Sequence, residues 1–190
     1  ATMLGRCGII KQEEADDIVQ GLKGILADIE NGTLHIDMEA EDIHTFIEGE
    51  LTKRIGDNGK RLHTSRSRND QVAVDIKLYL KKEVVNVKKL VVDLIKVIAD
   101  KAEKYSETVM PGYTHLQRAQ PITFGHHLLA YGEMLLRDVS RLEDCLKRMD
   151  EMPLGSCALA GTTYPIDRTI TAELLVFELI TNNSLDGVSD

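Results

Sequence analysis

Apolar residues recur every three or four positions along most of this chain, which is the spacing of one face of an α-helix. The pattern predicts a first amphipathic helix over 9–29, ended by Asn31-Gly32, and a second over about 41–55, ended by the turn sequence 56–59. Alternation typical of strands is nowhere sustained, and no internal repeat appears. The opening part of the chain is therefore predicted to be a small helical unit.

The longest pattern runs from about Asn69 to Tyr105 and meets no Gly or Pro before the break at Pro111-Gly112. It predicts one helix of about 35 residues, which is about 50 Å long at the standard rise. The valines in this stretch favour strands locally. Their helical context and the absence of breakers outweigh that modest preference.

Two more helices are predicted. One starts after Pro121 and runs to the break at Pro153, and the other begins near Asp167, a suitable N-cap. The apolar residues assigned to the second are Leu174, Leu175, Phe177 and Ile180. Helices this long need large partners to bury their apolar faces, so the fold class is all-α, a long-helix bundle shared between subunits.

Composition narrows the possible functions. The 190 residues are 43% hydrophobic, which is enough for a core, and the formal charge of −8 argues against nonspecific binding to nucleic acid or anionic membranes. The three cysteines form no C-x-x-C pair, so we expect free thiols in a reducing compartment. Without a targeting pattern or an apolar run long enough for a bilayer, the expected location is cytoplasmic. Both ends of the chain look like cuts.

A first polar segment, over 62–71, opens the longest predicted helix and reads Leu-His-Thr-Ser-Arg-Ser-Arg-Asn-Asp-Gln. Guanidinium groups pair bidentately with carboxylates, and hydroxyls, an amide and the helix N-terminus add further donors for an anion. The alternative is a solvated basic turn in which Ser or Asn caps the helix.

A second polar segment, over 111–121, is bounded by breakers and joins two long predicted helices as a loop. It carries His115, whose side chain suits a general acid or base near neutral pH. The alternative is a structural histidine. His126 and His127 lie in the first turns of the next helix, where we expect them to pack or to face solvent.

A third segment, over 154–165, is rich in small residues that allow the backbone to approach a ligand or another chain closely. A tight crossover between helices would use the same residues. Cys157 has no neighbouring histidine that would activate it as a nucleophile.

These three segments and the earlier Glu-Asp-Ile-His-Thr at 41–45 resemble argininosuccinate lyases of the fumarase/aspartase superfamily in order and spacing. The resemblance covers essentially the whole chain, and the choice of subfamily depends mainly on residues 65–71. It implies an all-α fold of that superfamily, with residues 1–68 in a partial N-terminal helical domain and 69–190 in the first part of the central bundle domain.

The resemblance also implies the chemistry. Members carry out a reversible β-elimination that splits argininosuccinate into arginine and fumarate, without metal or organic cofactor, as homotetramers with active sites shared between subunits. Because the three polar segments lie at the ends of helices about 50 Å long, we expect them to converge across chains rather than within one.

By motif, Asn69 and Thr114 would bind substrate, and Arg68 and Ser67 would help to hold its carboxylates. His115 would be the acid–base residue, acting as acid, as base or by polarising a water. In addition, two residues of the earlier motif, Asp42 and His44, would lie nearby.

The chain departs from the family pattern in three places. It lacks a segment matching the flexible Gly-Ser-Ser-x-Met-Pro loop, whose serine takes part in proton transfer, and it lacks an upstream serine segment, so we expect the fragment alone to be inactive. Cys157 also stands where the family usually has glycine. A lens structural protein of the delta-crystallin type is the alternative function, and a helical interaction module would have loops with fewer polar residues.

Overall fold

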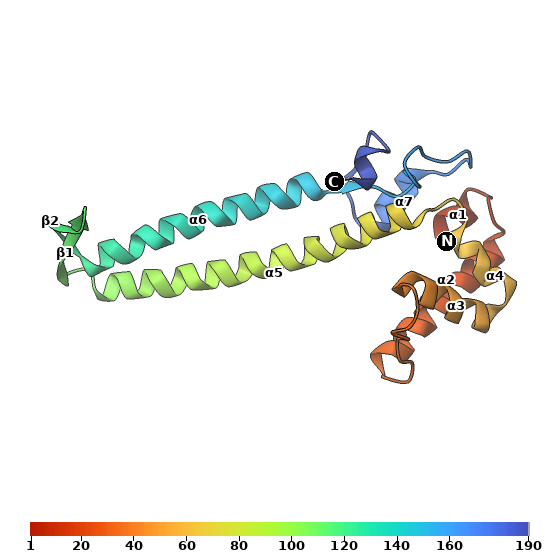
Figure 1. Cartoon of the computed structure of the whole chain (residues 1–190), viewed down its shortest axis with the longest axis horizontal. Coiled ribbons are helices and arrows are strands. Elements are labelled where there is room, and N and C mark those ends of the chain that lie inside the picture. Colours follow the sequence, from red (N-terminus) through yellow and green to blue (C-terminus); the bar gives the residue numbers. More distant parts are fainter. Residues whose placement is uncertain (190) are drawn as a thin grey trace. The chain divides into compact units, whose positions relative to one another are not determined.

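The computed structural model describes residues 1–189 and is mostly helical (Figure 1). It divides into two compact units, one made of Ala1–Asp75 with Glu151–Asp190 and the other of Ile76–Asp150. Each unit is described separately below. None of the helices within the described part of the chain is both long and apolar enough to cross a membrane. The domain boundary between residues 68 and 69 stays a prediction.

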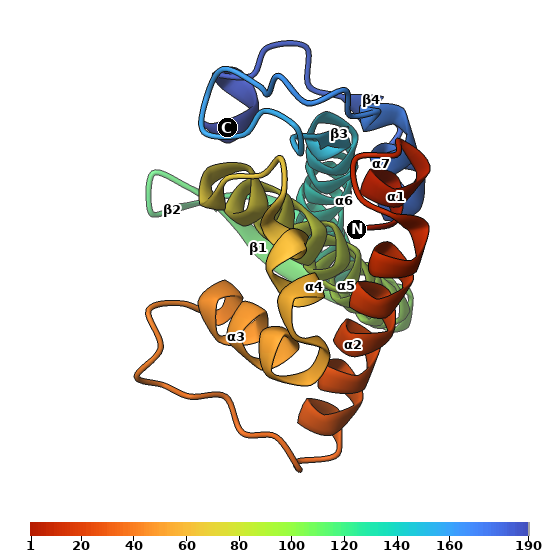
Figure 2. The ribbon, with the colours of Figure 1, turned by 90° about the vertical axis from the view of Figure 1, so that its right-hand side faces the viewer.

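Short helices pack around a small apolar core in the first unit, where α2 and α3 lie side by side (Figure 2). Its first elements are α1 (Thr2–Arg6), α2 (Gln12–Glu30), α3 (Ile43–Ile55), α4 (Asp57–Lys60) and the 3₁₀ turn η1 (Arg61–His63). The core consists of Leu4, Ile10, Ala15, Ile18, Ile25, Leu51 and Leu62. The predicted helix over 9–29 begins later, at Gln12, because Gly8 has φ of 68° and turns the chain between α1 and α2.

The end of the chain completes this unit. It comprises β3 (Glu151–Met152), α7 (Arg168–Leu175), β4 (Leu179–Ile180) and the 3₁₀ turn η2 (Asp186–Val188). Asp167 caps α7, which confirms the predicted start, because its side chain accepts the N–H of Thr169 at 2.9 Å. Phe177 and Ile180 were wrongly assigned to this helix. The helix ends at Leu175 because its C-cap, Val176, is left-handed with φ of 58°, and Ile180 instead pairs with Met152 in a parallel two-stranded sheet.

Two long helices form the second unit and run side by side (Figure 1). α5 (Arg68–Lys104) begins in the first unit and has 37 residues, in agreement with the predicted helix of about 35. α6 (Phe124–Met149) confirms the helix predicted between Pro121 and Pro153. The two are antiparallel, since the contact of Gly125 with Ala102 near one end is followed by the pairing of Glu143 with Lys88 farther along.

The segment over 111–121 is not a loop but most of a β-hairpin. β1 (Val109–Thr114) pairs with β2 (Gln117–Thr123), and the two-residue turn between them is His115-Leu116, with φ of 51° and 61°. The hydrophobic pattern did not predict these strands, because most of their residues are exposed and each strand contains a proline. A two-stranded ladder consists of edges alone, where proline is tolerated.

Candidate functional site

The first turn of α5 is closed by two side chains, those of Ser67 and Asp70, which accept backbone N–H groups of that turn. Ser67 Oγ accepts the N–H of Asn69 at 3.3 Å, and Asp70 Oδ1 accepts the N–H of Ser67 at 3.0 Å. The bond from Asp70 to Ser67 N–H is one half of a capping box, and Ser67 caps Asn69 instead of Asp70, so two N–H groups at the helix start are satisfied. Ser67 and Asp70 thus cap α5, as the capping alternative for this segment expects, and anion binding by the segment stays a prediction.

The guanidinium of Arg68 joins the start of α5 to the start of α3. Its Nε lies 2.8 Å from Asp42 Oδ2, its Nη1 lies 3.3 Å from Glu48 Oε1, and its Nη2 donates to Thr45 Oγ1 at 3.3 Å. Nη1 also donates to Gln71 Oε1 at 2.8 Å. Two carboxylates thus already balance this cation within the chain.

Asp42 has a second task as the N-cap of α3, where it accepts the N–H of Thr45 at 2.6 Å. That hydrogen bond, helped by the charge of Arg68, holds the pKa of Asp42 below its usual range. The group is ionised at neutral pH and is an acceptor, so it is suited to bind a substrate cation or amine rather than a carboxylate.

His44 lies in the first turn of α3 and pairs through Nε2 with Asp75 Oδ2 at 3.1 Å. Burial raises the pKa of Asp75, and the charges of His44 and Arg66 offset only part of this rise. The structure therefore brings five of the predicted site residues into one cluster of the first unit. They are Asp42, His44, Ser67, Arg68 and Asn69.

The small-residue loop, residues 155–161, lies against this cluster. Asp70 Oδ2 accepts the N–H groups of Gly155 and Cys157 at 3.0 and 2.9 Å, and Asn69 Nδ2 donates to Ala158 O at 2.9 Å. The first and third polar segments thus meet within one chain. The prediction that all three segments converge only across chains is wrong for these two.

Arg168 supports the loop from its other side. Its Nε donates to Leu154 O at 2.7 Å, and its Nη1 and Nη2 donate to Thr181 O and Met152 O at 3.0 and 3.1 Å. Burial lowers the pKa of this guanidinium, which donates to backbone carbonyls and to the hydroxyl of Thr181. Arg168 therefore acts as a backbone clamp between β3, β4 and the loop.

Sequence reasoning missed the residues that organise the cluster, above all Asp70, Glu48 and Arg168. Asp70 could have been recognised, because an acidic residue three positions after a serine at a helix start is the signature of a capping box. Nothing local marks Glu48 or Arg168, whose partners lie 15 to 20 and 13 to 16 residues away along the chain.

Thr114 and His115 lie in the second unit, at the tip of the β-hairpin. Thr114 is the last residue of β1 and pairs with Gln117, so His115 and Leu116 alone form the turn. All four residues are exposed, Leu116 to 95%. The histidine is therefore presented at the end of a rigid ladder rather than packed in a core.

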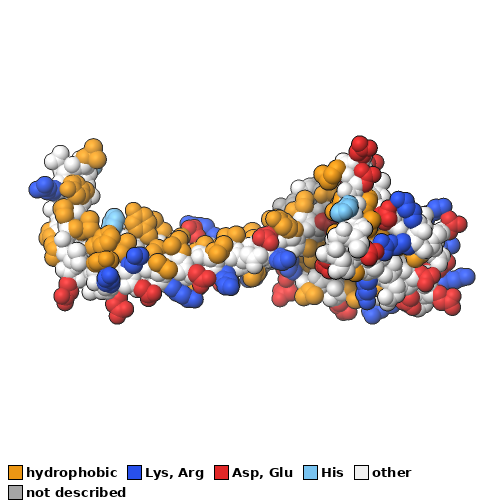
Figure 3. Space-filling model, turned by 90° about the horizontal axis from the view of Figure 1, so that it is seen from below, with side chains coloured by type: hydrophobic (Ala, Val, Ile, Leu, Met, Phe, Trp, Pro, Cys, Tyr) orange, Lys and Arg blue, Asp and Glu red, His pale blue; other side chains and the backbone are white. Residues whose placement is uncertain are grey.

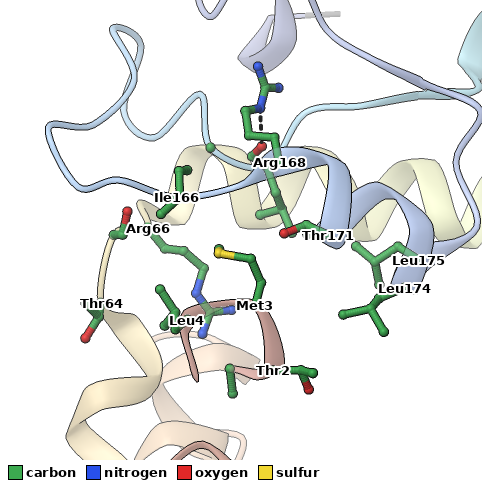
Figure 4. A pocket seen from close by; sticks show the side chains of 14 residues that line it. Thr2, Met3, Leu4, Thr64, Arg66, Ile166, Arg168, Thr171, Leu174 and Leu175 are labelled. Carbon is green, nitrogen blue, oxygen red and sulfur yellow. Dashed lines mark hydrogen bonds between the residues drawn. The ribbon is translucent and has the colours of Figure 1, made fainter. Parts of the chain in front are cut away.

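A cavity of about 300 Å³ lies elsewhere in the first unit, and Figure 4 shows it. Met3, Leu4 and the aliphatic residues of α7 line it, and the Arg66 side chain extends toward Met3. Burial lowers the pKa of Arg66, which donates to the Leu62 carbonyl. None of the predicted site residues lines this cavity, but Ser65, Gly155 and Arg168 do, so it adjoins the small-residue loop.

Within residues 1–189, no group of three or more His, Cys, Asp or Glu side chains is arranged to hold a metal ion. Cys157 has φ of 53°, and burial, followed by the charge of Asp70, raises the pKa of its thiol. A raised pKa lowers the thiolate fraction at neutral pH, so Cys157 is unsuited to be a nucleophile.

The chain was compared with protein families, with curated proteins and with solved structures. A protein family described as "Lyase" matches residues 2–190. The argininosuccinate lyase of Desulforamulus reducens is 60% identical over all 190 residues, and the chain spans 41% of the length of that relative.

Two solved structures share the fold. An EDDS lyase in complex with formate superimposes with a TM-score of 0.86 over 98% of this chain and 36% of its own, at 32% identity. A fumarate lyase:delta crystallin from Brucella melitensis superimposes with a TM-score of 0.79 over 98% of this chain and 46% of its own, at 20% identity. The second likeness concerns the fold alone.

Proposed function

The chain belongs to the lyase family, and on that premise we propose that it forms part of an argininosuccinate lyase, which splits argininosuccinate reversibly into arginine and fumarate. The observation that carries the proposal is 60% identity to such a lyase over every residue of the chain. The reaction is a carbon–nitrogen β-elimination of arginine biosynthesis or the urea cycle, and we place it in the cytoplasm.

The proposed roles of the cluster follow from its free donors and acceptors. Among residues 1–189, four of the five N–H groups of Arg68 have partners, which leaves one on Nη2 for a substrate carboxylate. Ser67 would support that contact. Asn69 is exposed and keeps one amide hydrogen and its carbonyl oxygen for the substrate, and Asp42 and His44 complete the polar surroundings.

In the second unit, Thr114 would bind substrate and His115 would move the proton. Removing a proton beside a carboxylate creates an aci-carboxylate with additional negative charge. Donors that are already fixed in place lower the barrier to that state, because they need no reorganisation during the reaction. The hairpin supports this role by presenting an exposed imidazole on a two-residue turn.

We also propose a homotetramer whose active sites combine residues of different subunits. Two features of the second unit support it. Large apolar side chains are exposed along α5, including Tyr79 at 64% and Leu90 at 68%, and the hairpin ends in the exposed Leu116. Figure 3 shows hydrophobic side chains along the long helices. Such a surface is typical of an interaction site.

The test is a chimera in which these 190 residues replace the matching segment of the Desulforamulus reducens lyase. We expect it to release fumarate from argininosuccinate, followed by ultraviolet absorbance, because the relative supplies the remaining part of the protein. The chimera with His115→Asn is the matched control for background release. A chimera that folds and assembles but releases no fumarate would contradict the proposal and favour a structural role of the delta-crystallin type.

A further inference from the structure

The carboxylate of Asp70 serves two elements at once. One oxygen accepts the N–H of Ser67 and closes the first turn of α5, and the other accepts the N–H groups of Gly155 and Cys157 in the small-residue loop. The residue is completely buried, at 0% exposure. A buried carboxylate with three backbone donors is a stronger anchor than a neutral side chain, because its hydrogen bonds are charge-assisted.

The loop that Asp70 holds determines where the Asn69 amide lies. Asn69 Nδ2 donates to Ala158 O at 2.9 Å, and Ala158 directly follows Cys157, whose N–H is bound by Asp70. Asn69 itself is exposed and immediately precedes Asp70. The orientation of its free amide atoms therefore depends on the loop, and the place of the loop depends on Asp70.

Other contacts reinforce this anchor, including one from Cys157 Sγ, a weak donor, to Ser65 O at 3.5 Å. Arg168 holds Leu154 O, just before the loop, and Thr162 meets Ser65 just after it, at an Oγ–Oγ distance of 3.3 Å. Within the loop, Cys157 adopts a left-handed φ of 53°, which is unfavourable for a residue other than glycine. Its N–H bond to Asp70 stabilises that conformation.

We propose that Asp70 is a positioning residue of the lyase, which fixes the small-residue loop on the start of α5 and thereby orients Asn69 for the substrate. Asp70 does not touch substrate in this arrangement, because its oxygens are occupied and buried. The kinetic consequence rests on the proposed function, whereas the structural consequence does not.

The test compares Asp70→Asn with Asp167→Asn in the chimera. Asparagine has only one side-chain oxygen, and its NH₂ group cannot accept a hydrogen bond. At position 70 it therefore loses either the bond from Ser67 N–H or the bonds from Gly155 and Cys157 N–H. At position 167 a single oxygen caps α7, and asparagine caps a helix as well as aspartate does. The two variants therefore share the chemical change but differ in its effect on the loop.

We expect Asp70→Asn to raise the KM for argininosuccinate about tenfold or more, the usual effect of losing a hydrogen bond to a charged group, with a smaller change in kcat. Hydrogen exchange resolved to single amides should become faster at Gly155 and Cys157. Asp167→Asn should change neither quantity. A folded Asp70→Asn variant with unchanged KM and unchanged exchange in the loop would overturn the proposal.

If the Asp70→Asn variant does not fold, amide hydrogen exchange in the unsubstituted chimera tests whether Asp70 anchors the loop. The amides of Gly155 and Cys157 should then exchange slowly, and those of Ala158, Leu159 and Ala160, which have no acceptor among the described residues, should exchange fast. Equally fast exchange at all five would refute the anchor. Lack of lyase activity in the unsubstituted chimera would instead count against the proposed function, while the exchange comparison would still test Asp70.

Discussion

At the scale of single residues, the charged groups at the start of α5 are held by one another. Arg68 is shared by Asp42 and Glu48, and His63 bonds the same Glu48 oxygen at 3.0 Å. Groups held this way lose little freedom when a ligand arrives, which favours both affinity and transition-state stabilisation.

Glu48 should make stability depend on pH. Partial burial alone would raise the pKa of Glu48, but the hydrogen bonds and charges of His63 and Arg68 outweigh it and hold that pKa below 4.5. Because the folded-state pKa is lowered, ionised Glu48 stabilises the fold fully above the unfolded-state pKa. This contribution is lost as the pH falls through the lowered pKa.

We therefore expect Glu48→Gln to cost about 1 kcal/mol or less near pH 7 and to flatten the loss of stability below pH about 4.5. Urea unfolding between pH 7 and pH 3 measures both. Glu39→Gln makes the same change at an exposed residue without an ion pair in the described structure, and it should leave the pH dependence intact. Parallel curves for Glu48→Gln and the parent would rule out this role of Glu48.

His115 gives the second prediction at this scale. His115→Asn in the chimera should lower kcat about 10² to 10⁴-fold, the usual contribution of a general acid or base, without changing the melting temperature. Asparagine tolerates the left-handed φ of 51° at this turn, and the exposed imidazole packs in no core. His126→Asn, at an exposed position of α6, is the control for a nonspecific effect. Unchanged turnover in a folded His115→Asn variant would remove this residue from the mechanism.

At the scale of elements, the contact between α5 and α6 depends on a glycine. A Cβ at Gly125 would lie 2.4 Å from the Ala102 carbonyl oxygen and 3.1 Å from Ser106 Cα, so the first turn of α6 lies directly against the end of α5. Both near atoms belong to the backbone. Neither helix can therefore relieve the clash without moving, and the hairpin β1–β2 joins the helices at this same place.

Gly125→Ala should lower the free energy of unfolding by about 1 to 3 kcal/mol, the usual cost of overpacking. Gly132→Ala is the matched control in the same helix, since the nearest atom to its Cβ, Ile98 Cγ2, is 3.8 Å away. It should be neutral or stabilising by about 0.5 to 1 kcal/mol, because alanine favours helix. Chemical unfolding monitored by circular dichroism compares the two, and equal effects would contradict the proposed contact.

At the scale of the whole molecule, the proposed homotetramer would cover the apolar side chains that α5 exposes. We expect Leu90→Glu to weaken subunit association in the chimera, because it places a charge where the side chain is 68% exposed and apolar neighbours continue along the helix. Sedimentation should show smaller species. Lys89→Glu is the control: it changes the net charge more than Leu90→Glu does, but at an adjacent exposed position that is already charged, so it should preserve assembly. An unchanged mass for Leu90→Glu would exclude this part of α5 from the interface.

The sequence by itself determined the helices and the family. The uninterrupted helical spacing of apolar residues from Asn69 predicted α5, and Asp167 predicted the start of α7. The motifs around Asn69 and His115 indicated the lyase family. Helical spacing, capping and motif order can be read from the sequence because they are local properties of a chain. Tertiary structure decided the rest. Asp70 meets Gly155 and Cys157 across 85 and 87 residues, and the 111–121 segment pairs as strands despite its prolines, since both depend on contacts that local pattern does not encode.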